Sequence, residues 1–419
     1  MLAVEISLLA LLLLLASGAP IFIAVGAAAV GGLLVAGVPF DTAAQVFVSS
    51  LGGNALLAIP LFVLMAEIMT NSGMITRLVN LLSAIVGHWH GGLGYVAVFA
   101  SAIFAAFSGS SPANAAALGI ALIPQMLAVG YSPRFTAGVI AAGGTLGILI
   151  PPSINMILYS AVTDLPVLDL FRAGIKPGLL LAGAFLVVVA IWNKIAPFPV
   201  LPRQGGAARL AQLRAGGPVL LLPLIVLGSI YSAVLTVTES AIAGILYALV
   251  LQLGWYRDFK WAQLYQALAR TVKTTSMIYL IIGTASLFAH LLTLSQIPQQ
   301  MAGQISPLIE FSPIAFYAAA MLLLVVMGMF IDVAAITYIA VPVLDYALRQ
   351  HGLDRMQFAM MFVINMEMAL ITPPFGLNTF IVAAAAKLPI GEVVRGAAPF
   401  VAAMVVVIII VGMFPALSH

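Results

Sequence analysis

Charged residues and cysteine are what this sequence of 419 residues lacks most. Only 7% of its residues are charged, against about 25% in ordinary soluble proteins, and 63% are apolar. Cysteine is absent, which excludes disulfides, thiolate chemistry and Cys-ligated metals. The net charge of +3 is spread along the chain and forms no basic face, which argues against nucleic-acid binding. The mean hydropathy of +1.19 therefore indicates an all-α, multi-pass membrane protein.

The apolar segments form two series separated by a polar, basic stretch at 195–217. Each helical crossing needs about 20 apolar residues. The N-terminus has no basic region before its apolar residues and no small-residue cleavage site, so we expect a first membrane segment and not a signal peptide. The expected segments are 2–18, 20–38, 50–70, 93–107, 112–129, 134–162 and 177–194, then 218–235, 238–254, 274–294, 313–330, 333–348, 357–386 and 399–416.

Two of these segments contain a Pro-Pro pair that interrupts a helix. In GGTLGILIPPSIN, Gly143 to Asn155, the pair Pro151-Pro152 removes two backbone donors and disfavours the α conformation at Ile150. The sequence ITPPFGLN at 371–378 has the same pattern. Unpaired backbone groups cost several kcal/mol each in hydrocarbon, so such a break persists only against protein or a wet cavity. Interrupted helices at matching positions of two halves are typical of a transporter's binding site.

A longer match supports an internal repeat. Pro124 corresponds to Pro342, the two Pro-Pro pairs correspond, and Arg172 to Pro177 corresponds to Arg395 to Pro399. A chance coincidence of two apolar Pro-Pro helices is the alternative. We therefore predict a first repeat at 1–194 and a second at 218–419, joined by a cytoplasmic loop at 195–217. Each repeat is expected to hold a hairpin (93–129 and 313–348) and a broken helix (134–162 and 357–386).

The positive charges indicate how the repeats are oriented. With the loop at 195–217 in the cytoplasm, twelve of the sixteen Lys and Arg residues lie in predicted cytoplasmic loops, as the positive-inside rule requires. The N-terminus then lies on the opposite side, so the repeats are inverted. Charge does not decide whether the hairpins cross or re-enter, because both return the chain to its starting side. The four other cations are Arg172, Lys176, Arg349 and Arg355.

The first hairpin has a small, polar tip, FSGSSPAN, in which Gly109 and Pro112 break the helix. Ser108, Ser110 and Ser111 can cap a half-helix whose N–H groups face an anion. Carbonyl groups at the end of the opposing half-helix can bind a small cation. An ordinary loop between two helices is the alternative.

The second hairpin tip, in GMFIDVAAI, contains Asp332. An acid within the membrane indicates a cation partner or a proton carrier, although it can equally cap the next half-helix. Near the second Pro-Pro pair, Thr372 offers hydroxyl and carbonyl oxygens to a hard cation such as sodium. Asn155 and Asn378 can face one cavity; helix capping or interhelical hydrogen bonding is the alternative for these residues.

Other ionisable residues fall in or near the spans. Glu239 follows Thr236 in the pattern of a helix cap, so we expect a structural role. Glu367 lies close to the second Pro-Pro pair, and Glu67 lies within a span. His290 is expected at the membrane interface.

Taken together, SGSSPANAAALGIALIPQM, GYSPRFTAGVIAAGGTLGILIPPSINMILY, GMFIDVAAI and ITPPFGLNTFI resemble the large membrane subunit of tripartite ATP-independent periplasmic (TRAP) transporters. The resemblance covers essentially the whole chain. It implies an elevator-type secondary transporter of the bacterial inner membrane with inverted repeats and two re-entrant hairpins. It also implies sodium symport of an organic anion: a C4-dicarboxylate, sialic acid or another carboxylate. The implied partners are a periplasmic substrate-binding protein and a separate small four-helix membrane subunit.

The resemblance also implies which residues act. No catalytic residue and no cofactor other than coupling sodium ions are expected. The chain departs from the family pattern at Pro112 and Asn114, where Val and Thr are expected, and at Ala369, where Gly is usual. The expected sodium ligands are Ser108, Ser111, Gly147, Ile150, Pro152, Gly328, Ala369, Thr372 and Phe375. The residues we assign to the solute are Ser110, Asn114, Asn155, Asp332 and Asn378.

Three other functions were weighed. Coupling to protons would place the exchangeable proton on Asp332 or Glu367. An intramembrane serine hydrolase built on Ser108 to Ser111 needs a nearby base, and the nearest histidines, His88 and His90, fall in a predicted loop. An ion channel rarely needs two inverted broken-helix repeats. We therefore expect a transporter and not an enzyme.

Overall fold

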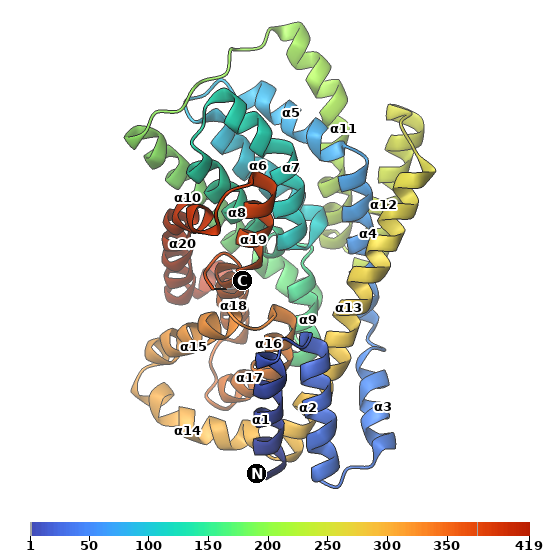
Figure 1. Cartoon of the computed structure of the whole chain (residues 1–419), viewed down its shortest axis with the longest axis vertical. Coiled ribbons are helices and arrows are strands. Elements are labelled where there is room, and N and C mark those ends of the chain that lie inside the picture. The colour runs from blue at the N-terminus through green and yellow to red at the C-terminus, as the bar shows by residue number, and fades with distance from the viewer. Residues whose placement is uncertain (1, 375) are drawn as a thin grey trace.

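The computed structural model describes residues 2–374 and 376–419, and within these ranges every regular element is a helix (Figure 1). The prediction of an all-α protein is confirmed. Six of the described helices are long and apolar enough to cross a membrane, or up to eight if each bent pair counts as one span. The chain is therefore a multi-pass membrane protein.

The helices of the first half include every element of the first predicted hairpin and broken helix. They are α1 (Leu2–Ala16), α2 (Ile21–Val35), α3 (Phe40–Ser50), the 3-10 turn η1 (Asn54–Leu57), α4 (Ala58–Asn71), α5 (Met74–Val86), α6 (Gly92–Ser108), α7 (Ser111–Val129), α8 (Pro133–Leu149), α9 (Ile154–Thr163) and α10 (Val167–Ile195).

The elements that the structure describes in the second half are also helices and helical turns. They are α11 (Gly206–Tyr231), α12 (Val237–Val250), the π-helical turn η2 (Leu251–Tyr256), α13 (Trp261–Leu294), α14 (Ile297–Phe311), α15 (Pro313–Gly328), α16 (Val333–Ile339), α17 (Val341–Gln350), α18 (Arg355–Ala369), α19 (Leu377–Ala386), α20 (Ile390–Met413) and the 3-10 turn η3 (Pro415–Ser418).

Several stretches that the sequence suggested were loops are helical. The clearest case is α5, where Arg77 and Asn80 made the sequence look too polar for a membrane segment. Its Ile75, Leu78 and Leu82 recur every three to four residues and are all buried, so α5 is an amphipathic helix packed on the protein. Helix α14 likewise fills the predicted loop at 295–312, and α11 begins inside the predicted loop at 195–217.

The two interrupted helices occupy the centre of the molecule. Every residue of α8 from Phe135 to Leu149 is buried, and so is every residue of α18 from Gln357 to Ala369. Helix α8 packs against α6, α7, α10, α18, α19 and α20. Helices α1 to α3 gather at the end of the molecule that holds the N-terminus, and the long α13 runs along one side (Figure 1). A helix that is buried on all faces is enclosed by other helices, so α8 and α18 are shielded from the lipid.

Candidate functional site

The first break lies between α8 and α9. The two helices are bent by 42° relative to each other. Ile150, with φ −82° and ψ 120°, leaves the helical conformation directly before Pro151, as the steric effect of a proline on the preceding residue requires. Ser153 then caps α9, because its hydroxyl accepts a hydrogen bond of 3.3 Å from the Met156 N–H. Residues 151–153 are buried.

The tip of the first hairpin rests directly on this break. Helix α6 ends in Gly109, whose φ of +59° suits a glycine, and Ser110 caps α7 by accepting from the Ala113 N–H at 3.4 Å. The Ile154 N–H donates a 3.3 Å hydrogen bond to the Gly109 carbonyl. A Cβ on Gly147 would lie 3.0 Å from the Ser110 carbonyl oxygen and 3.0 Å from the Asn114 side chain. Glycine is therefore required where α8 approaches the tip.

The second break, between α18 and α19, faces the second hairpin in a similar way. A Cβ on Gly328, at the end of α15, would lie only 2.7 Å from the Ala369 Cβ, where α18 ends. The Thr372 hydroxyl donates to the Met368 carbonyl at 2.6 Å. Pro373 and Pro374 are exposed, whereas Pro151 and Pro152 are buried. Phe375, an expected sodium ligand, lies outside the described residues.

The two halves meet through Asn378, on α19, and Ser111, at the first hairpin tip. The Asn378 side-chain amide donates a 2.7 Å hydrogen bond to the Ser111 hydroxyl. A Cβ on Gly144 would lie 3.0 Å from the same amide nitrogen. The Asn114 amide donates to the Ser101 carbonyl at 3.2 Å. Elements from both predicted repeats therefore converge on the first hairpin tip.

Asn155 does not take part in this convergence. It lies in the first turn of α9, is 7% exposed, and its side-chain nitrogen is buried without a hydrogen bond. No hydrogen bond links it to Asn378 in the part of the chain that the structure describes. The hypothesis that the two asparagines face one cavity therefore stays a prediction.

Among the residues that the structure describes, several buried oxygens around the first hairpin tip have no hydrogen-bond partner. They are the Ser108 hydroxyl, the Asn114 and Asn378 side-chain carbonyls, and both carboxyl oxygens of Glu367. The Ser111 hydroxyl lies beside the Glu367 carboxyl group without making a conventional hydrogen bond to it. Buried polar atoms are normally paired, so each such atom needs an explanation. Neutral and charged oxygens are the ligands that hard cations prefer, so each of these oxygens is a candidate ligand for a small cation such as sodium.

Asp332 caps the second hairpin's inner helix. Its carboxylate accepts a 2.8 Å hydrogen bond from the Ala334 N–H at the start of α16, so the capping hypothesis is confirmed. Glu239 is likewise confirmed as part of a helix cap: Thr236 and Glu239 form a reciprocal capping box at the start of α12. Glu67 lies 3.7 Å from Arg270 on α13, an ion pair that the sequence did not indicate.

The cluster around Asp345 was missed altogether. Asp345 is 4% exposed and binds both Arg349 and Arg355. The i,i+4 spacing of Asp345 and Arg349 was a signal that could have revealed part of it. Arg349 and Arg355, two of the four cations outside the predicted cytoplasmic loops, are thus both paired with Asp345.

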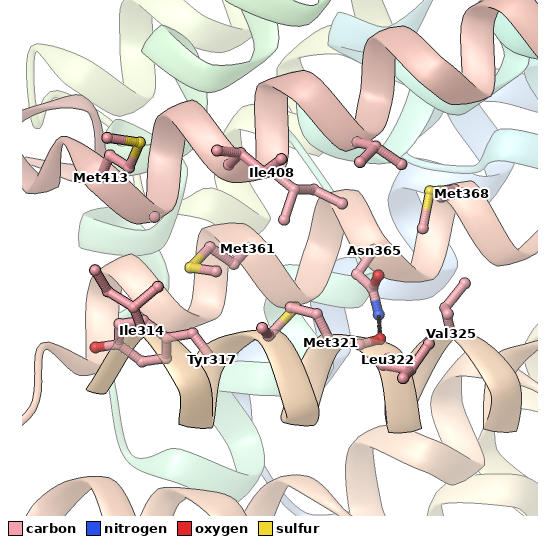
Figure 2. Close-up of a pocket in the computed structure, with 14 residues that line it drawn as sticks. Ile314, Tyr317, Met321, Leu322, Val325, Met361, Asn365, Met368, Ile408 and Met413 are labelled. Carbon is pink, nitrogen blue, oxygen red and sulfur yellow. Dashed lines mark hydrogen bonds between the residues drawn. The ribbon is translucent and has the colours of Figure 1, made fainter. Parts of the chain in front are cut away.

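An apolar cavity lies apart from these polar groups. It has a volume of about 500 Å³ and lies between α15, α18 and α20. Figure 2 shows its lining, in which the one hydrogen bond drawn runs from the Asn365 amide to the Met321 carbonyl, at 2.9 Å. Leu322 and Ile409, which contribute to its lining, are exposed at the surface of the chain. Such a cavity offers a carboxylated solute no charged partner.

Apolar helices of spanning length, with two helices interrupted beside hairpin tips, are typical of a multi-pass membrane protein of the transporter class. Residues 8–417 match the family described as tripartite ATP-independent periplasmic transporter, DctM component. The chain belongs to this family of TRAP large permease subunits. It is therefore a transporter subunit and not an enzyme, as expected from the sequence.

Individual relatives agree with this assignment. The chain is 41% identical, over 87% of its length and 85% of the relative's, to the C4-dicarboxylate TRAP transporter large permease protein of Pseudomonas aeruginosa. It is 36% identical to the 2,3-diketo-L-gulonate permease protein of Escherichia coli, covering 85% and 84% of the two chains. It is 33% identical to the ectoine/5-hydroxyectoine permease protein of Ruegeria pomeroyi, covering 98% and 96%.

Solved structures support the fold alone. The YdaH transporter of Alcanivorax borkumensis aligns with a TM-score of 0.60 at 16% identity, over 90% of this chain and 88% of that one. MtrF of Neisseria gonorrhoeae, titled as one of a class of antimetabolite efflux pumps, aligns with a TM-score of 0.58 at 13% identity, over 88% and 83%.

Proposed function

We propose that this chain imports a carboxylated organic solute across the bacterial inner membrane by symport with sodium ions. The named solutes of the three relatives, a C4-dicarboxylate, diketogulonate and ectoine, all carry at least one carboxylate. Sialic acid, another carboxylate, belongs to the same chemical class. The solute would be delivered by a periplasmic binding protein, and a small four-helix subunit would complete the membrane complex.

The observation that carries the proposal is the hydrogen bond between Asn378 and Ser111. It joins the second interrupted helix to the first hairpin tip, which itself rests on the first break through Gly109 and Ile154. An ion bound at the tip would therefore act on both halves of the protein at once. That arrangement suits coupling, because a ligand shifts an equilibrium only through unequal contacts with the two states.

The proposed sodium ligands fall into two groups. In the first half they are the oxygens of Ser108, Ser111, Gly147, Ile150 and Pro152. In the second half they are those of Gly328, Ala369, Thr372 and Phe375. The free hydroxyl of Ser108, buried and unpaired, is the strongest support for the first group. The contact between Gly328 and Ala369 supports the second.

The solute's negative charge would be met by helix N-termini. Ser110 and Ser153 mark the N-termini of α7 and α9 at adjoining places, and N–H groups with a positive dipole end favour an anion there. The side chains proposed for the solute are Ser110, Asn114, Asn155, Asp332 and Asn378. In this proposal Asp332 contacts a hydroxyl or ammonium group of the solute or its accompanying cation, because a carboxylate repels a carboxylate.

We further propose that the two hairpins are re-entrant and that the two inverted repeats, 1–194 and 218–419, carry the site across the membrane by an elevator motion. Both hairpin tips lie against interrupted helices near the centre of the molecule. That placement favours tips that end inside the membrane over ordinary extramembrane loops.

The test is uptake by the purified complex in proteoliposomes, with its small subunit and binding protein. Labelled succinate, sialic acid and ectoine are each offered with an inward sodium gradient, and separately with an inward proton gradient at equal sodium. The proposal expects uptake of at least one carboxylate that requires sodium on the outside. Uptake that follows the proton gradient and ignores sodium would contradict it.

Proton coupling is the second candidate, and Glu367 is the observation that favours it. Its carboxyl group is fully buried, and within the described part of the chain neither oxygen has a hydrogen bond of conventional geometry. A buried carboxylate without a cation is costly, so either a proton or a cation must neutralise it. The same proteoliposome experiment separates the two candidates.

A further inference from the structure

A charged cluster centred on the buried Asp345 lies at the C-terminal end of α9. The Asp345 carboxylate binds the Arg355 guanidinium at 2.6 and 3.0 Å and the Arg349 Nε at 2.7 Å. Both arginines also donate to the carbonyl of Thr163, the last residue of α9, Arg349 at 2.7 Å. Cations are favoured at the C-terminal end of a helix. The first half's interrupted helix is thus held by two arginine side chains of the second half, both of which are paired with Asp345.

A second ion pair makes the reverse connection. Arg134, in the first turn of α8, binds the Glu392 carboxylate in the first turn of α20 through two hydrogen bonds of 2.9 and 3.3 Å. Arg395 also donates to Glu392, at 3.2 Å. The second half's junction between α19 and α20 is thus held by a side chain of the first half.

The two connections occupy equivalent places. Arg134 and Arg355 each stand in the first turn of an interrupted helix. Each reaches the junction that follows the other interrupted helix. Those junctions are alike: α9 ends in left-handed Asp164 followed by Leu-Pro, and α19 ends in left-handed Lys387 followed by Leu-Pro.

The connections differ in strength. The Asp345 side chain is 5% exposed, whereas those of Arg134 and Glu392 are 47% and 32% exposed. An exposed ion pair contributes little by itself. Breaking a buried one is costly, because it leaves a charge uncompensated.

We propose that Asp345, Arg349 and Arg355 are positioning residues for the first break, acting through α9. Helix α9 has ten residues, so it is about 15 Å long and transmits orientation from one end to the other. Its inner end carries Ser153 and Ile154, which meet the hairpin tip. Fixing the Thr163 end therefore fixes the angle at which residues 150–153 present their carbonyl groups. Arg134 and Glu392 perform the reciprocal task for the second break.

This inference rests on the proposed function only for the identity of the ion that binds at the break. The first test is therefore independent of transport. The natural chain has no cysteine, so Ile154→Cys introduces a single thiol at a site that is 7% exposed. Its rate of alkylation by N-ethylmaleimide in the membrane reports how tightly α9 is held against the tip. The second test is the half-saturating sodium concentration for uptake.

Arg349→Gln is the main variant, because Arg349 is half-exposed and its loss leaves Arg355 in place. Asp345→Asn is the stronger variant, which can fail to fold. Arg172→Gln is the matched control: Arg172 pairs with Asp169 at 4.0 Å on the surface of the same region. We expect Arg349→Gln to speed Ile154→Cys labelling at least threefold and to raise half-saturating sodium at least threefold. The maximum rate should stay within twofold, and the control should change neither measure.

The outcomes separate the two claims. Faster labelling in Arg349→Gln without any sodium dependence in the parent protein would leave positioning intact and refute sodium coupling. Unchanged labelling in both Arg349→Gln and folded Asp345→Asn would overturn the positioning role. So would a lower maximum rate with labelling and half-saturating sodium at the parent values, because that is the signature of a purely structural contact.

Discussion

Asn378 and Ser111, 267 positions apart in sequence, are joined by a hydrogen bond of 2.7 Å in the buried interior. Neither residue is exposed by more than 1%. The bond therefore links α19 to the first hairpin tip at a point where water does not compete. It is the most direct connection between the two halves of the site.

Removing this bond should impair both halves together. We expect Asn378→Ala and Ser111→Ala each to lower sodium-driven uptake at least tenfold and to cost about 1–3 kcal/mol in stability, because each leaves a buried polar group unpaired. The double variant should be little worse than either single one. Uptake and thermal unfolding in detergent measure both effects, with Asn80→Ala on α5 as the control. Additive losses in the double variant would contradict a shared role.

Gly147→Ala tests the contact between α8 and the hairpin tip. The new methyl group would lie 3.0 Å from the Ser110 carbonyl and the Asn114 side chain, so these neighbours at the tip must shift to accommodate it. We expect half-saturating sodium to rise at least fivefold. Gly183→Ala, in α10 with open space around it, is the matched control and should be neutral. Normal sodium dependence in Gly147→Ala would argue against sodium ligation at this tip.

Gly396→Ala tests the close approach of α8 and α20. Its Cβ would fall 2.0 Å from the Arg134 carbonyl oxygen, and a backbone atom cannot move aside as a flexible side chain can. We expect a loss of about 1–3 kcal/mol or more, typical of overpacking, seen as a lower unfolding temperature in detergent. Gly391→Ala on the same helix has nothing within 4 Å. Equal unfolding temperatures for the two variants would refute this account.

The pair of Arg134 and Glu392 can be tested by exchanging its charges. Arg134→Glu places two carboxylates side by side and should lower uptake several-fold. Adding Glu392→Arg restores an attractive pair and should recover most of the activity. The gain in stability should be small, because exposed ion pairs contribute little to stability. Failure of the exchanged pair to recover any uptake would mean that the pair does not act through its charge.

Substitutions of Asp332 can separate its role as a helix cap from the role of its negative charge in uptake. Asparagine caps helices as well as aspartate does, whereas alanine costs about 0.5–2 kcal/mol. Asp332→Asn should therefore unfold at the parent temperature and Asp332→Ala below it. We expect uptake to fall at least tenfold in both, because the charge is lost in both. Full uptake in Asp332→Asn would mean that Asp332 acts only as a helix cap and that its charge is not needed for transport.

The sequence predicted the helical class and the interruption between α8 and α9, because Pro151 and Pro152 act on the local backbone. It also predicted the cap at Glu239 from its position after Thr236, and gave the cap at Asp332 as one of two alternatives. It did not predict α5 or α14, because polar residues on one face of a helix lower its mean hydropathy to a value that is typical of a loop. Helix α5 is stabilised by burial of one face, which depends on partners far along the chain.

The polar network could be predicted only in part. Ser108, Ser111, Asn114 and Asn378 were identified from their positions beside helix breaks. Which of them are in contact could not be predicted, because that depends on packing between residues hundreds of positions apart.

The Asp345 cluster was missed because its contact at Thr163 is made by a backbone carbonyl. Every residue has such a carbonyl, so the residue type gives no signal of the contact.

The two Pro-Pro pairs read alike in sequence but lie in different surroundings. Pro151 and Pro152 are enclosed, whereas Pro373 and Pro374 are exposed. The same substitution in the two pairs is therefore expected to affect the folded protein differently. The enclosed copy has little room to vary without disturbing the hairpin tip beside it. The exposed copy is freer to diverge, so a duplicated motif can keep one copy fixed while the other is reshaped by selection for a different solute.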